Sequence, residues 1–426
     1  MRKTAAVLTV ILLLTGCAFG AIEDMLSPPR LTDEQQAIYT ALVDSKGSGF
    51  KLKYPRTGEY RSAFVVYGEN DSAALVFYEI SGINIERTLL VNFLYKDADG
   101  KWESLYEIPI RGTDIESVGF ASFGEDEEEN ILLSYAVGQN EKRCMIISGI
   151  GSKPELRFDD GYSFMAVDSF FGREYKELLL IKIERSVQTA TATFYTYKEG
   201  ELFRSAQSEL DPGAGEYTEI MQGYIAQGVP ALFINHRKHD SADFGTDVLF
   251  HRGDRLVNPI VANSDNIERT TRRTGLITEL ANPLDIDGDG VALLPSSTGE
   301  FPGYEHLSAQ EKLRPVVWRT LSGNALVEKY FSYFSERLGF VFLFPERWVG
   351  AVTVAVNIDE NTVSFYAAGA PIEEAAADNL ILRISVIFEN EQMYHYLNRE
   401  NPENPLTLTE EELEFAFRIL SEIGAD

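Results

Sequence analysis

The sequence predicts a mainly β protein, with a five-unit β-propeller-like repeat domain followed by a small α+β domain. Phe and Tyr account for 26 and 20 of the 426 residues, and aromatic side chains are enriched in strands. From Phe50 onward, short apolar runs alternate with acidic or glycine-containing turns, and this pattern recurs about every 50 residues. A period near 50 residues with four strands per unit is typical of a propeller blade.

Each predicted unit opens with an alternating apolar strand, turns, and continues with a strongly apolar strand. In the first unit these are residues 60–67 and 74–78. Two further strands are expected at 88–95 and 101–108, joined by the hairpin signal Asp97-Ala98-Asp99-Gly100.

The units are spaced at nearly regular steps along the chain. Ala63, Val118, Met165 and Ile220 occupy equivalent places at steps of 55, 47 and 55 residues, and the fifth unit, 276–294, is the least regular. The repeat domain is therefore predicted at 50–333. An irregular pair of β-sandwiches is the alternative to a propeller.

Residues 334–426 are predicted to form the small α+β domain. Strands are expected at 351–356, 362–367 and 380–388, and a helix is expected to begin at Thr409. The stretch 339–348 is similar to the opening hairpin of small α+β sandwiches in bacterial lipoproteins and photosystem II extrinsic proteins. That resemblance implies an accessory module rather than an enzyme.

The first residues have the layout of a secretory signal. Arg2 and Lys3 precede an apolar run over 5–14, and the segment closes with Leu14-Thr15-Gly16-Cys17. This ending resembles the bacterial lipobox, which implies that 1–16 is a signal peptide cleaved before Cys17. Cys17 would then carry diacylglycerol and palmitate-type acyl chains, and would tether the protein to a bilayer on the extracytoplasmic side. An ordinary signal peptide is the alternative.

Residues 17–49 are expected to form a lipidated tether and one short helix. Thr32 has the residue type of an N-cap, and Ile38, Leu42 and Val43 follow at helical spacing. Gly47 is the expected end of the helix.

The composition excludes some partners. The formal net charge is −28, so the chain repels the phosphates of nucleic acids, and no nucleic-acid partner is expected. Cys144 lies in an apolar run without a second cysteine beyond Cys17, which predicts a buried strand cysteine rather than a nucleophile.

One loop has the pattern of a metal site. Asp285, Asp287 and Asp289 alternate in Asp-Ile-Asp-Gly-Asp-Gly, and carboxylates at this spacing suit a hard cation such as calcium. The loop joins two apolar strands, and in this setting it resembles the Asp-rich loop of FG-GAP or VCBS propeller blades, which implies calcium binding. Leu293 stands where the family pattern places another acid, and Ser296 stands at the bidentate Glu position of an EF-hand. A turn favoured by Asp and Gly alone is the alternative.

No catalytic motif stands out. The sequence lacks G-x-S-x-G, H-E-x-x-H, a phosphate loop and G-x-G-x-x-G. The segment 236–240, with Asp243 nearby, matches no zinc spacing and is interpreted as a polar loop. Tyr304, Trp318 and Trp348 are candidates for sugar or peptide binding, with core packing as their default role.

These observations favour a non-catalytic, membrane-tethered module that binds a protein, peptide or glycan. The alternative is a lipid-anchored extracellular hydrolase with two carboxylates in a central propeller pocket. A third possibility is a spacer stiffened by calcium. Whether the protein is an enzyme stays open at this point.

Overall fold

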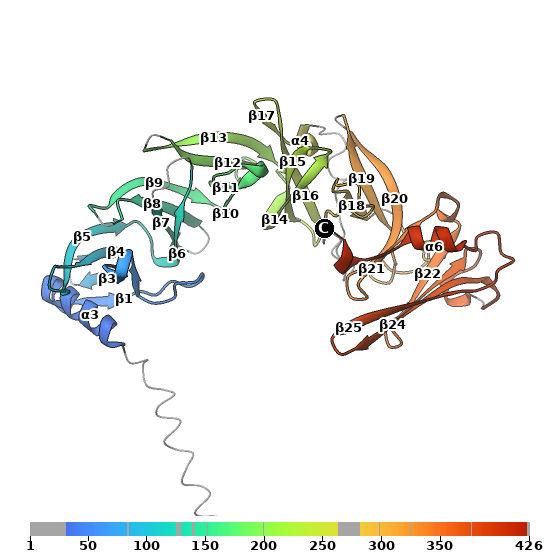
Figure 1. The fold of residues 1–426 in the computed structure, drawn as a ribbon, viewed down its shortest axis with the longest axis horizontal. Coiled ribbons are helices and arrows are strands. Elements are labelled where there is room, and N and C mark those ends of the chain that lie inside the picture. Colours follow the sequence, from blue (N-terminus) through green and yellow to red (C-terminus); the bar gives the residue numbers. More distant parts are fainter. Residues whose placement is uncertain are drawn as a thin grey trace, which may run out of the picture. The chain divides into compact units, whose positions relative to one another are not determined.

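The computed structural model describes residues 31–423 apart from 83–84, 125–128, 139–140, 151, 199, 263–281, 298, 324 and 376. Cys17 and the signal segment lie outside the described residues. The described part is mainly β, and it contains six sheets that follow one another along the chain (Figure 1). Four of these sheets have four strands and two have five. The predicted fold class is confirmed at this level, because sheets of about four strands are the repeating unit of a propeller-like protein.

The helices and strands have the following bounds. Sheet 1 contains β1 (Phe50–Leu52), β2 (Phe64–Tyr67), β3 (Ala73–Gly82), β4 (Ile85–Lys96) and β5 (Trp102–Ile110), and sheet 2 contains β6 (Asp114–Ser122), β7 (Glu129–Val137), β8 (Glu141–Ser148) and β9 (Glu155–Tyr162). Sheet 3 contains β10 (Phe164–Asp168), β11 (Glu177–Glu184), β12 (Thr189–Lys198) and β13 (Glu201–Leu210), and sheet 4 contains β14 (Ala214–Ala226), β15 (Val229–Lys238), β16 (Phe244–Arg252) and β17 (Arg255–Val257). Sheet 5 contains β18 (Leu294–Ser297), β19 (Val316–Ser322), β20 (Ala325–Ser335), β21 (Phe340–Phe344) and β26 (Phe417–Ile419), and sheet 6 contains β22 (Val352–Asn357), β23 (Thr362–Ala367), β24 (Leu380–Glu389) and β25 (Gln392–Arg399). The α-helices are α3 (Asp33–Lys46), α4 (Pro259–Ala262) and α6 (Glu410–Ala416), and the 3-10 helices are η1 (Glu69–Asp71), η2 (Phe170–Gly172), η3 (Glu346–Trp348), η4 (Ile372–Glu374), η5 (Ala377–Asn379) and η6 (Leu420–Glu422).

The chain divides into two compact units. One consists of Met1–Phe120 and Glu129–Asp160, and the other of Ala121–Glu128 and Gly161–Asp426. In the first unit, sheets 1 and 2 share a core to which Leu75, Phe77, Leu133 and Tyr135 contribute. Helix α3 covers the other face of sheet 1 with Ile38 and Leu42, so this sheet is covered on both faces.

Helix α3 forms as the sequence predicts. The Thr32 hydroxyl accepts a hydrogen bond from the Gln35 backbone N–H, and the Gln35 side chain accepts one from the Thr32 N–H. This reciprocal pair is a capping box, which satisfies two of the donors that a helix start leaves free. Gly47, at φ +76°, ends the helix.

In the second unit, sheets 3 to 6 are joined by successive clusters of buried side chains. Leu179 and Phe194 of sheet 3 pack with Leu232 and Leu249 of sheet 4. The inner strands of these sheets, such as β15 and β16, are buried over most of their length, whereas β13 is largely exposed. Burial on both faces explains why the inner strands are continuous apolar runs.

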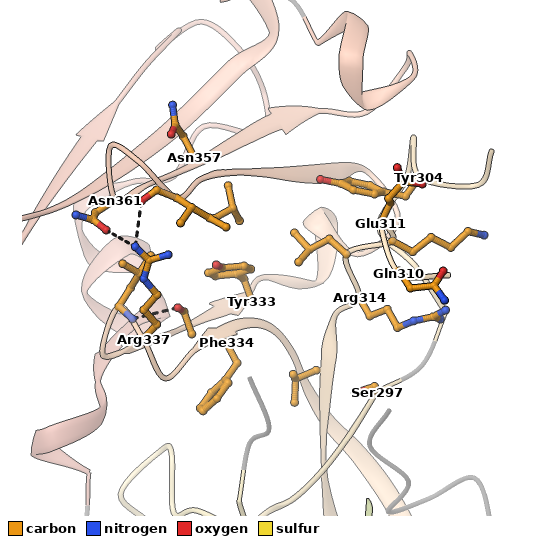
Figure 2. Close-up of a pocket in the computed structure, with 17 residues that line it drawn as sticks. Ser297, Tyr304, Gln310, Glu311, Arg314, Tyr333, Phe334, Arg337, Asn357 and Asn361 are labelled. Atoms are coloured by element: carbon orange, nitrogen blue, oxygen red, sulfur yellow. Dashed lines mark hydrogen bonds between the residues drawn. The ribbon is translucent and has the colours of Figure 1, made fainter. Parts of the chain in front are cut away.

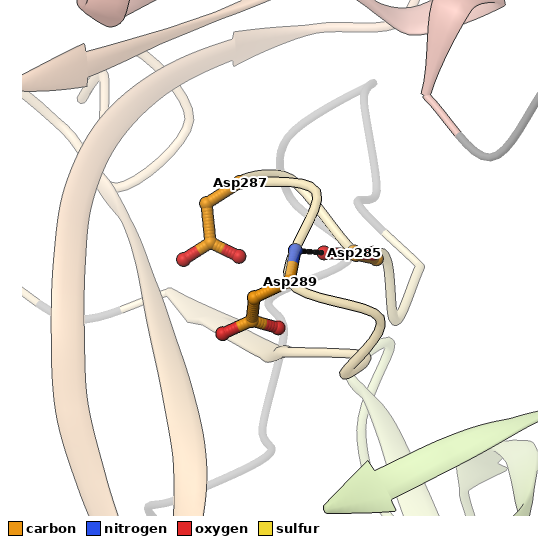
Figure 3. Close-up of side chains that lie close together, drawn as sticks. All are labelled: Asp285, Asp287 and Asp289. Atoms are coloured by element: carbon orange, nitrogen blue, oxygen red, sulfur yellow. Dashed lines mark hydrogen bonds between the residues drawn. The ribbon is translucent and has the colours of Figure 1, made fainter. Parts of the chain in front are cut away.

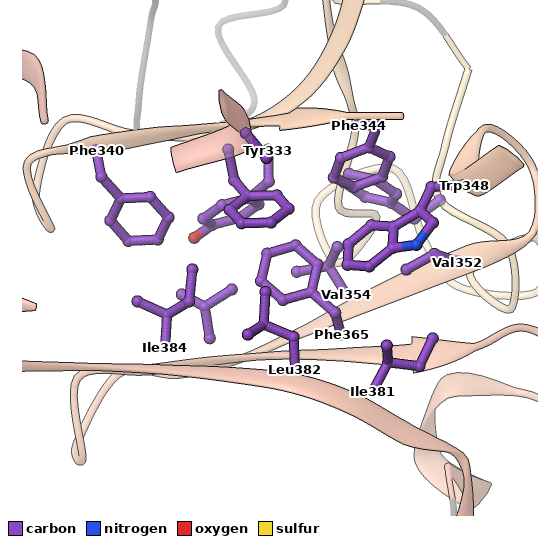
Figure 4. Close-up of a cluster of buried hydrophobic side chains, with 14 of the residues drawn as sticks. Tyr333, Phe340, Phe344, Trp348, Val352, Val354, Phe365, Ile381, Leu382 and Ile384 are labelled. Atoms are coloured by element: carbon purple, nitrogen blue, oxygen red, sulfur yellow. The ribbon is translucent and has the colours of Figure 1, made fainter. Parts of the chain in front are cut away.

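Sheets 5 and 6 share a large aromatic cluster. Figure 4 shows Phe340, Phe344 and Trp348 facing Phe365 of sheet 6. Trp348 stacks on Phe342 with ring centroids 5.5 Å apart, and offset aromatic contacts of this kind contribute beyond area burial. Sheet 5 runs across residue 334, because β20 and β21 pair as neighbours. The division into 50–333 and 334–426 stays a prediction.

Two predicted elements differ from the structure. The helix begins at Thr409, which caps α6 through a second capping box with Glu412, but it ends at Ala416. The next residues form β26, which pairs with the edge of β21, so strand pairing replaces further helical turns. The sequence does not predict strand β25, which is mostly exposed and whose apolar residues do not alternate regularly with polar ones.

The fifth predicted unit is only partly described. Residues 276–281 lie outside the described residues, and Leu284 forms an isolated bridge with Leu293. The strand expected at 291–294 shares only Leu294 with β18. Among the described residues, no helix is long and apolar enough to cross a membrane.

Candidate functional site

The second unit contains a cavity of about 370 Å³ at one end of sheets 5 and 6. Its walls come from three segments that are distant in sequence: the loop between β18 and β19, the end of β20, and the hairpin between β22 and β23 (Figure 2). A volume of this size is within the range of small-molecule sites.

The apolar part of the cavity lies on the ends of strands. Val316 begins β19, Phe334 belongs to β20, and Val356 and Ile358 belong to the β22–β23 hairpin. Ile358 is 61% exposed, so the cavity is open to solvent on this side. Such side chains suit the apolar body of a ligand.

The polar part of the cavity contains three cations. Lys312 pairs with Glu300 at 3.1 Å. Arg337 donates hydrogen bonds from Nη2 to the Ile358 carbonyl, at 3.0 Å, and to Asn361 Oδ1, at 2.9 Å. Arg314 lies on the opposite side of the cavity from Arg337 (Figure 2).

The carboxylate of Glu311 also lines the cavity, but it already accepts hydrogen bonds from the protein. The hydroxyl and the backbone N–H of Ser308 both donate to its Oε2, and the hydroxyl hydrogen bond is the main reason that the pKa of Glu311 lies below its usual range. Among the described residues that line the cavity there is no histidine, cysteine or aspartate, and Glu311 is the one carboxylate.

The three aspartates of the predicted calcium loop are brought together. Ligand atoms of Asp285, Asp287 and Asp289 lie within 4.8 Å of one another (Figure 3). Asp285 is engaged within the loop, since its Oδ1 accepts hydrogen bonds from the N–H groups of Gly288 and Asp289, and its Oδ2 accepts one from Gly290. This is the geometry of an Asx turn, in which Asp organises its own backbone.

A lysine supplies the positive charge in this loop. Lys329 Nζ lies 2.6 Å from Asp287 Oδ2 and 2.7 Å from Asp289 Oδ2, and the Tyr330 hydroxyl donates to Asp287 Oδ2 at 2.9 Å. Burial opposes the charge of Asp287, but the hydrogen bonds from Lys329 and Tyr330 outweigh it and hold the pKa of Asp287 below its usual range. The loop therefore has its own counter-cation.

The segment interpreted as a polar loop is in part a buried strand. His236 and Lys238 belong to β15, and His236 is 1% exposed. Its Nε2 lies 3.2 Å from Asp211 Oδ2, and its Nδ1 lies 3.5 Å from Asp247 Oδ2. The imidazole thus lies between two carboxylates, with a hydrogen bond to Asp211 only, and its buried Nδ1 has no hydrogen-bond partner in the described part of the chain. The interpretation failed for His236 because pairing in the middle of sheet 4 places it in the core.

The two carboxylates of this buried cluster have opposite pKa shifts. Burial raises the pKa of Asp247, which is fully buried. For Asp211, burial also acts upward, but hydrogen bonds with His236 and Lys238 prevail, and the pKa lies well below its usual range. Asp211, His236 and Asp247 are all buried and contact one another, so the cluster is a structural network rather than an open site.

The other described residues that the sequence analysis singled out are buried. Cys144 is buried in β8, and burial raises the pKa of its thiol to about 12, so the structural interpretation is confirmed. Trp318 and Trp348 are fully buried in the core. Tyr304 is 8% exposed and lines the cavity, where its hydroxyl donates to the Val354 carbonyl.

Sequence reasoning missed the cavity itself. Arg314, Tyr333 and Arg337 have no motif around them, and they meet only because the β18–β19 loop folds over the end of sheet 5. The one signal was Tyr304, which was singled out as an aromatic candidate.

No protein-family model and no curated protein matches this chain. Among solved structures, the chain is similar to the periplasmic gluconolactonase of Pseudomonas aeruginosa, with 12% identity, 77% of this chain and 86% of that chain covered, and a TM-score of 0.28. It is also similar to the β-propeller domain of the Trilobed protease from Pyrococcus furiosus, with 9% identity, 82% and 95% coverage, and a TM-score of 0.26. A sucrose-6-phosphate hydrolase from Lactobacillus gasseri has 11% identity, 87% and 92% coverage, and a TM-score of 0.25. Likeness at these scores assigns neither a fold nor an activity to this chain.

Proposed function

We propose that this chain is a non-catalytic binding module, tethered to a membrane on its extracytoplasmic side by acylated Cys17. The observation that carries the binding role is the cavity between the β18–β19 loop and the β22–β23 hairpin. It combines apolar walls with a few convergent polar groups, which is the usual composition of a small-molecule site.

The chemistry of the cavity supports binding better than hydrolysis. A glycoside hydrolase of the usual kind needs two carboxylates about 5–9.5 Å apart across the scissile bond. Glu311 is the one carboxylate among the described lining residues, and Ser308 already engages it. The lining hydroxyls of Ser297 and Ser335 have no lining histidine to act as a base in the described part of the chain.

Two further parts of the proposal come from the sequence. The lipobox-like segment ending at Cys17 supports the membrane tether, and the FG-GAP-like or VCBS-like spacing of Asp285, Asp287 and Asp289 supports calcium binding. In that loop calcium would have to displace the ammonium group of Lys329.

A fragment screen by ligand-observed NMR tests the binding role. The purified protein is compared with Val356→Trp, which fills the cavity from β22, and with Ile387→Trp as a matched control. Ile387 is 46% exposed on β24 and does not line the cavity. We expect fragments that bind the parent and Ile387→Trp but not Val356→Trp.

The same proteins also test the hydrolase alternative. Incubation with chromogenic esters, lactones and glycosides should give no turnover above the buffer rate. Turnover that Val356→Trp abolishes and Ile387→Trp retains would contradict the non-catalytic role. A screen in which Val356→Trp binds the same fragments as the parent would contradict the assignment of this cavity.

A further inference from the structure

The guanidinium group of Arg314 is only partly used by the protein. Its Nη1 donates to the Gly299 carbonyl at 2.7 Å and lies 3.9 Å from Glu300 Oε2. The Nε donor is buried and has no hydrogen-bond partner in the described part of the chain. Buried donors in folded proteins are nearly always paired, so a buried Nε without an acceptor requires an explanation.

Arg314 lines the cavity, so a ligand bound there can supply the hydrogen-bond acceptor that Nε lacks. A guanidinium presents its donors as a planar fork, and two oxygens of a carboxylate match two of these donors at once. Because the protein uses Nη1, the edge with Nε and Nη2 is the one left for such a pair, and a ligand reaches the buried Nε only when the side chain turns toward the cavity.

The charge balance of the cavity also favours an anion. Glu300 pairs with Lys312 and also lies near Arg314, and Glu311 keeps its negative charge, so three cations (Lys312, Arg314 and Arg337) face two carboxylates and leave one positive charge in excess. Arg337 donates hydrogen bonds to two neutral oxygens, those of Ile358 and Asn361. The chain as a whole has a formal net charge of −28, so this cavity is a local positive site on an acidic protein. Such a site selects bound ligands by their charge, but it does not attract anions from a distance.

The rest of the lining favours an apolar body over a hydrated one. Val316, Phe334, Leu338 and Val356 also line the cavity. Figure 2 shows Tyr333 and Phe334 between Arg314 and Arg337. A small inorganic anion would leave these side chains without a partner.

We propose that the cavity binds an organic carboxylate with an apolar body, whose carboxylate pairs with the Nε side of Arg314. This inference rests on the proposed binding function and adds the class of ligand. Arg337, on the other side of the cavity, stays hydrogen-bonded to the β22–β23 turn and contributes its positive charge.

The test compares carboxylates with their neutral amides. The probes are hexanoate, octanoate and 3-phenylpropanoate, each with its matched primary amide, and inorganic phosphate as an anion without an apolar body. Dissociation constants are measured by calorimetry on the purified full chain, on Arg314→Gln, on Arg314→Lys and on Arg383→Gln. Arg383 is an exposed β24 residue outside the cavity and serves as the matched control.

We expect each carboxylate that binds to do so at least about tenfold more tightly than its amide, because a charge-assisted pair is lost in the amide. Arg314→Gln should remove this preference, Arg314→Lys should restore only part of it, and Arg383→Gln should leave it unchanged. Phosphate should bind more weakly than the carboxylates.

The outcomes separate this inference from the proposed function. If carboxylate and amide bind the cavity equally well, or if Arg314→Gln keeps the preference, the ligand class is wrong while the binding function stands. If Val356→Trp binds every probe as well as the parent does, the cavity is not the binding site and both proposals fail. Circular dichroism and thermal unfolding confirm that each variant is folded.

Discussion

Lys329 Nζ lies 2.6 Å from Oδ2 of Asp287, inside the loop whose three aspartates predict calcium. The side chain of Asp287 is 8% exposed and that of Lys329 is 28% exposed, so this ion pair is largely shielded from water. The ammonium group of Lys329 bridges Asp287 and Asp289, and it places a positive charge beside the three carboxylates of the loop.

The first prediction concerns competition between this lysine and calcium. Lys329→Met leaves Asp287 and Asp289 without their cation, so without calcium the variant should lose about 1–3 kcal/mol of unfolding free energy. Calcium at a hundredfold excess over its dissociation constant should restore about 2.7 kcal/mol. Thermal unfolding with calcium and with chelator measures both effects.

Lys312→Met is the matched control for this experiment, because Lys312 pairs with Glu300 outside the loop. Its response to calcium should match that of the parent. If the unfolding temperature of neither the parent nor Lys329→Met changes with calcium, the loop is a turn that Asp and Gly stabilise by themselves. The proposal that this loop binds calcium is then wrong.

The second prediction concerns the pH dependence of stability. The pKa of Asp211 is well below its usual range in the folded protein, so its ion pairs stabilise the fold above the unfolded pKa of about 3.9 and are lost as the pH falls through the folded pKa. Asp211→Asn should cost about 3 kcal/mol near pH 7. The difference from the parent should shrink as the pH is lowered below about 4.

Urea unfolding at a series of pH values measures this difference. Asp240→Asn is a control on the neighbouring loop, since the side chain of Asp240 is 95% exposed, and it should match the parent throughout. A gap between the parent and Asp211→Asn that stays constant on acidification would show that the charge of Asp211 is not what stabilises sheet 4.

The third prediction concerns the thiol of Cys144. Burial raises its pKa to about 12, and the thiolate is the reactive form. In a Cys17→Ser background, Cys144 should react with a thiol reagent more than about a hundredfold more slowly in the folded protein than in denaturant. Ser186→Cys, in an exposed turn after β11, provides a reactive control. Rapid labelling of Cys144 in the native state would mean that β8 opens easily.

The fourth prediction concerns the membrane tether. Cells that express the full chain and are fed an alkyne analogue of palmitate should label the parent but not Cys17→Ser. The parent should sediment with membranes, and two acyl chains are sufficient for stable anchoring. Equal labelling of both proteins would contradict acylation at Cys17, and an unlabelled but secreted parent would identify an ordinary signal peptide.

Local chemistry was sufficient to predict much of the fold. The cap formed by Thr32 and Gln35, the hairpin after Asp97 and the apolar inner strands follow from hydrogen bonding and periodicity between near neighbours. The Asp285 turn could be predicted for the same reason. Strand β25 could not be predicted, because its apolar residues Met393, Tyr394, Tyr396 and Leu397 do not alternate regularly with polar ones.

The sequence by itself determined the succession of strands, the helix α3 and the close spacing of Asp285, Asp287 and Asp289. Only the tertiary structure decided which distant groups meet: Lys329 in the aspartate loop, His236 between Asp211 and Asp247, and Arg314 facing the cavity. The physical reason is that a turn or strand depends on residues a few positions apart, whereas a cavity or a buried ion pair depends on how whole sheets pack. Between Ser297 and Asn361 that packing brings three separate segments around one cavity, and no local pattern encodes their meeting.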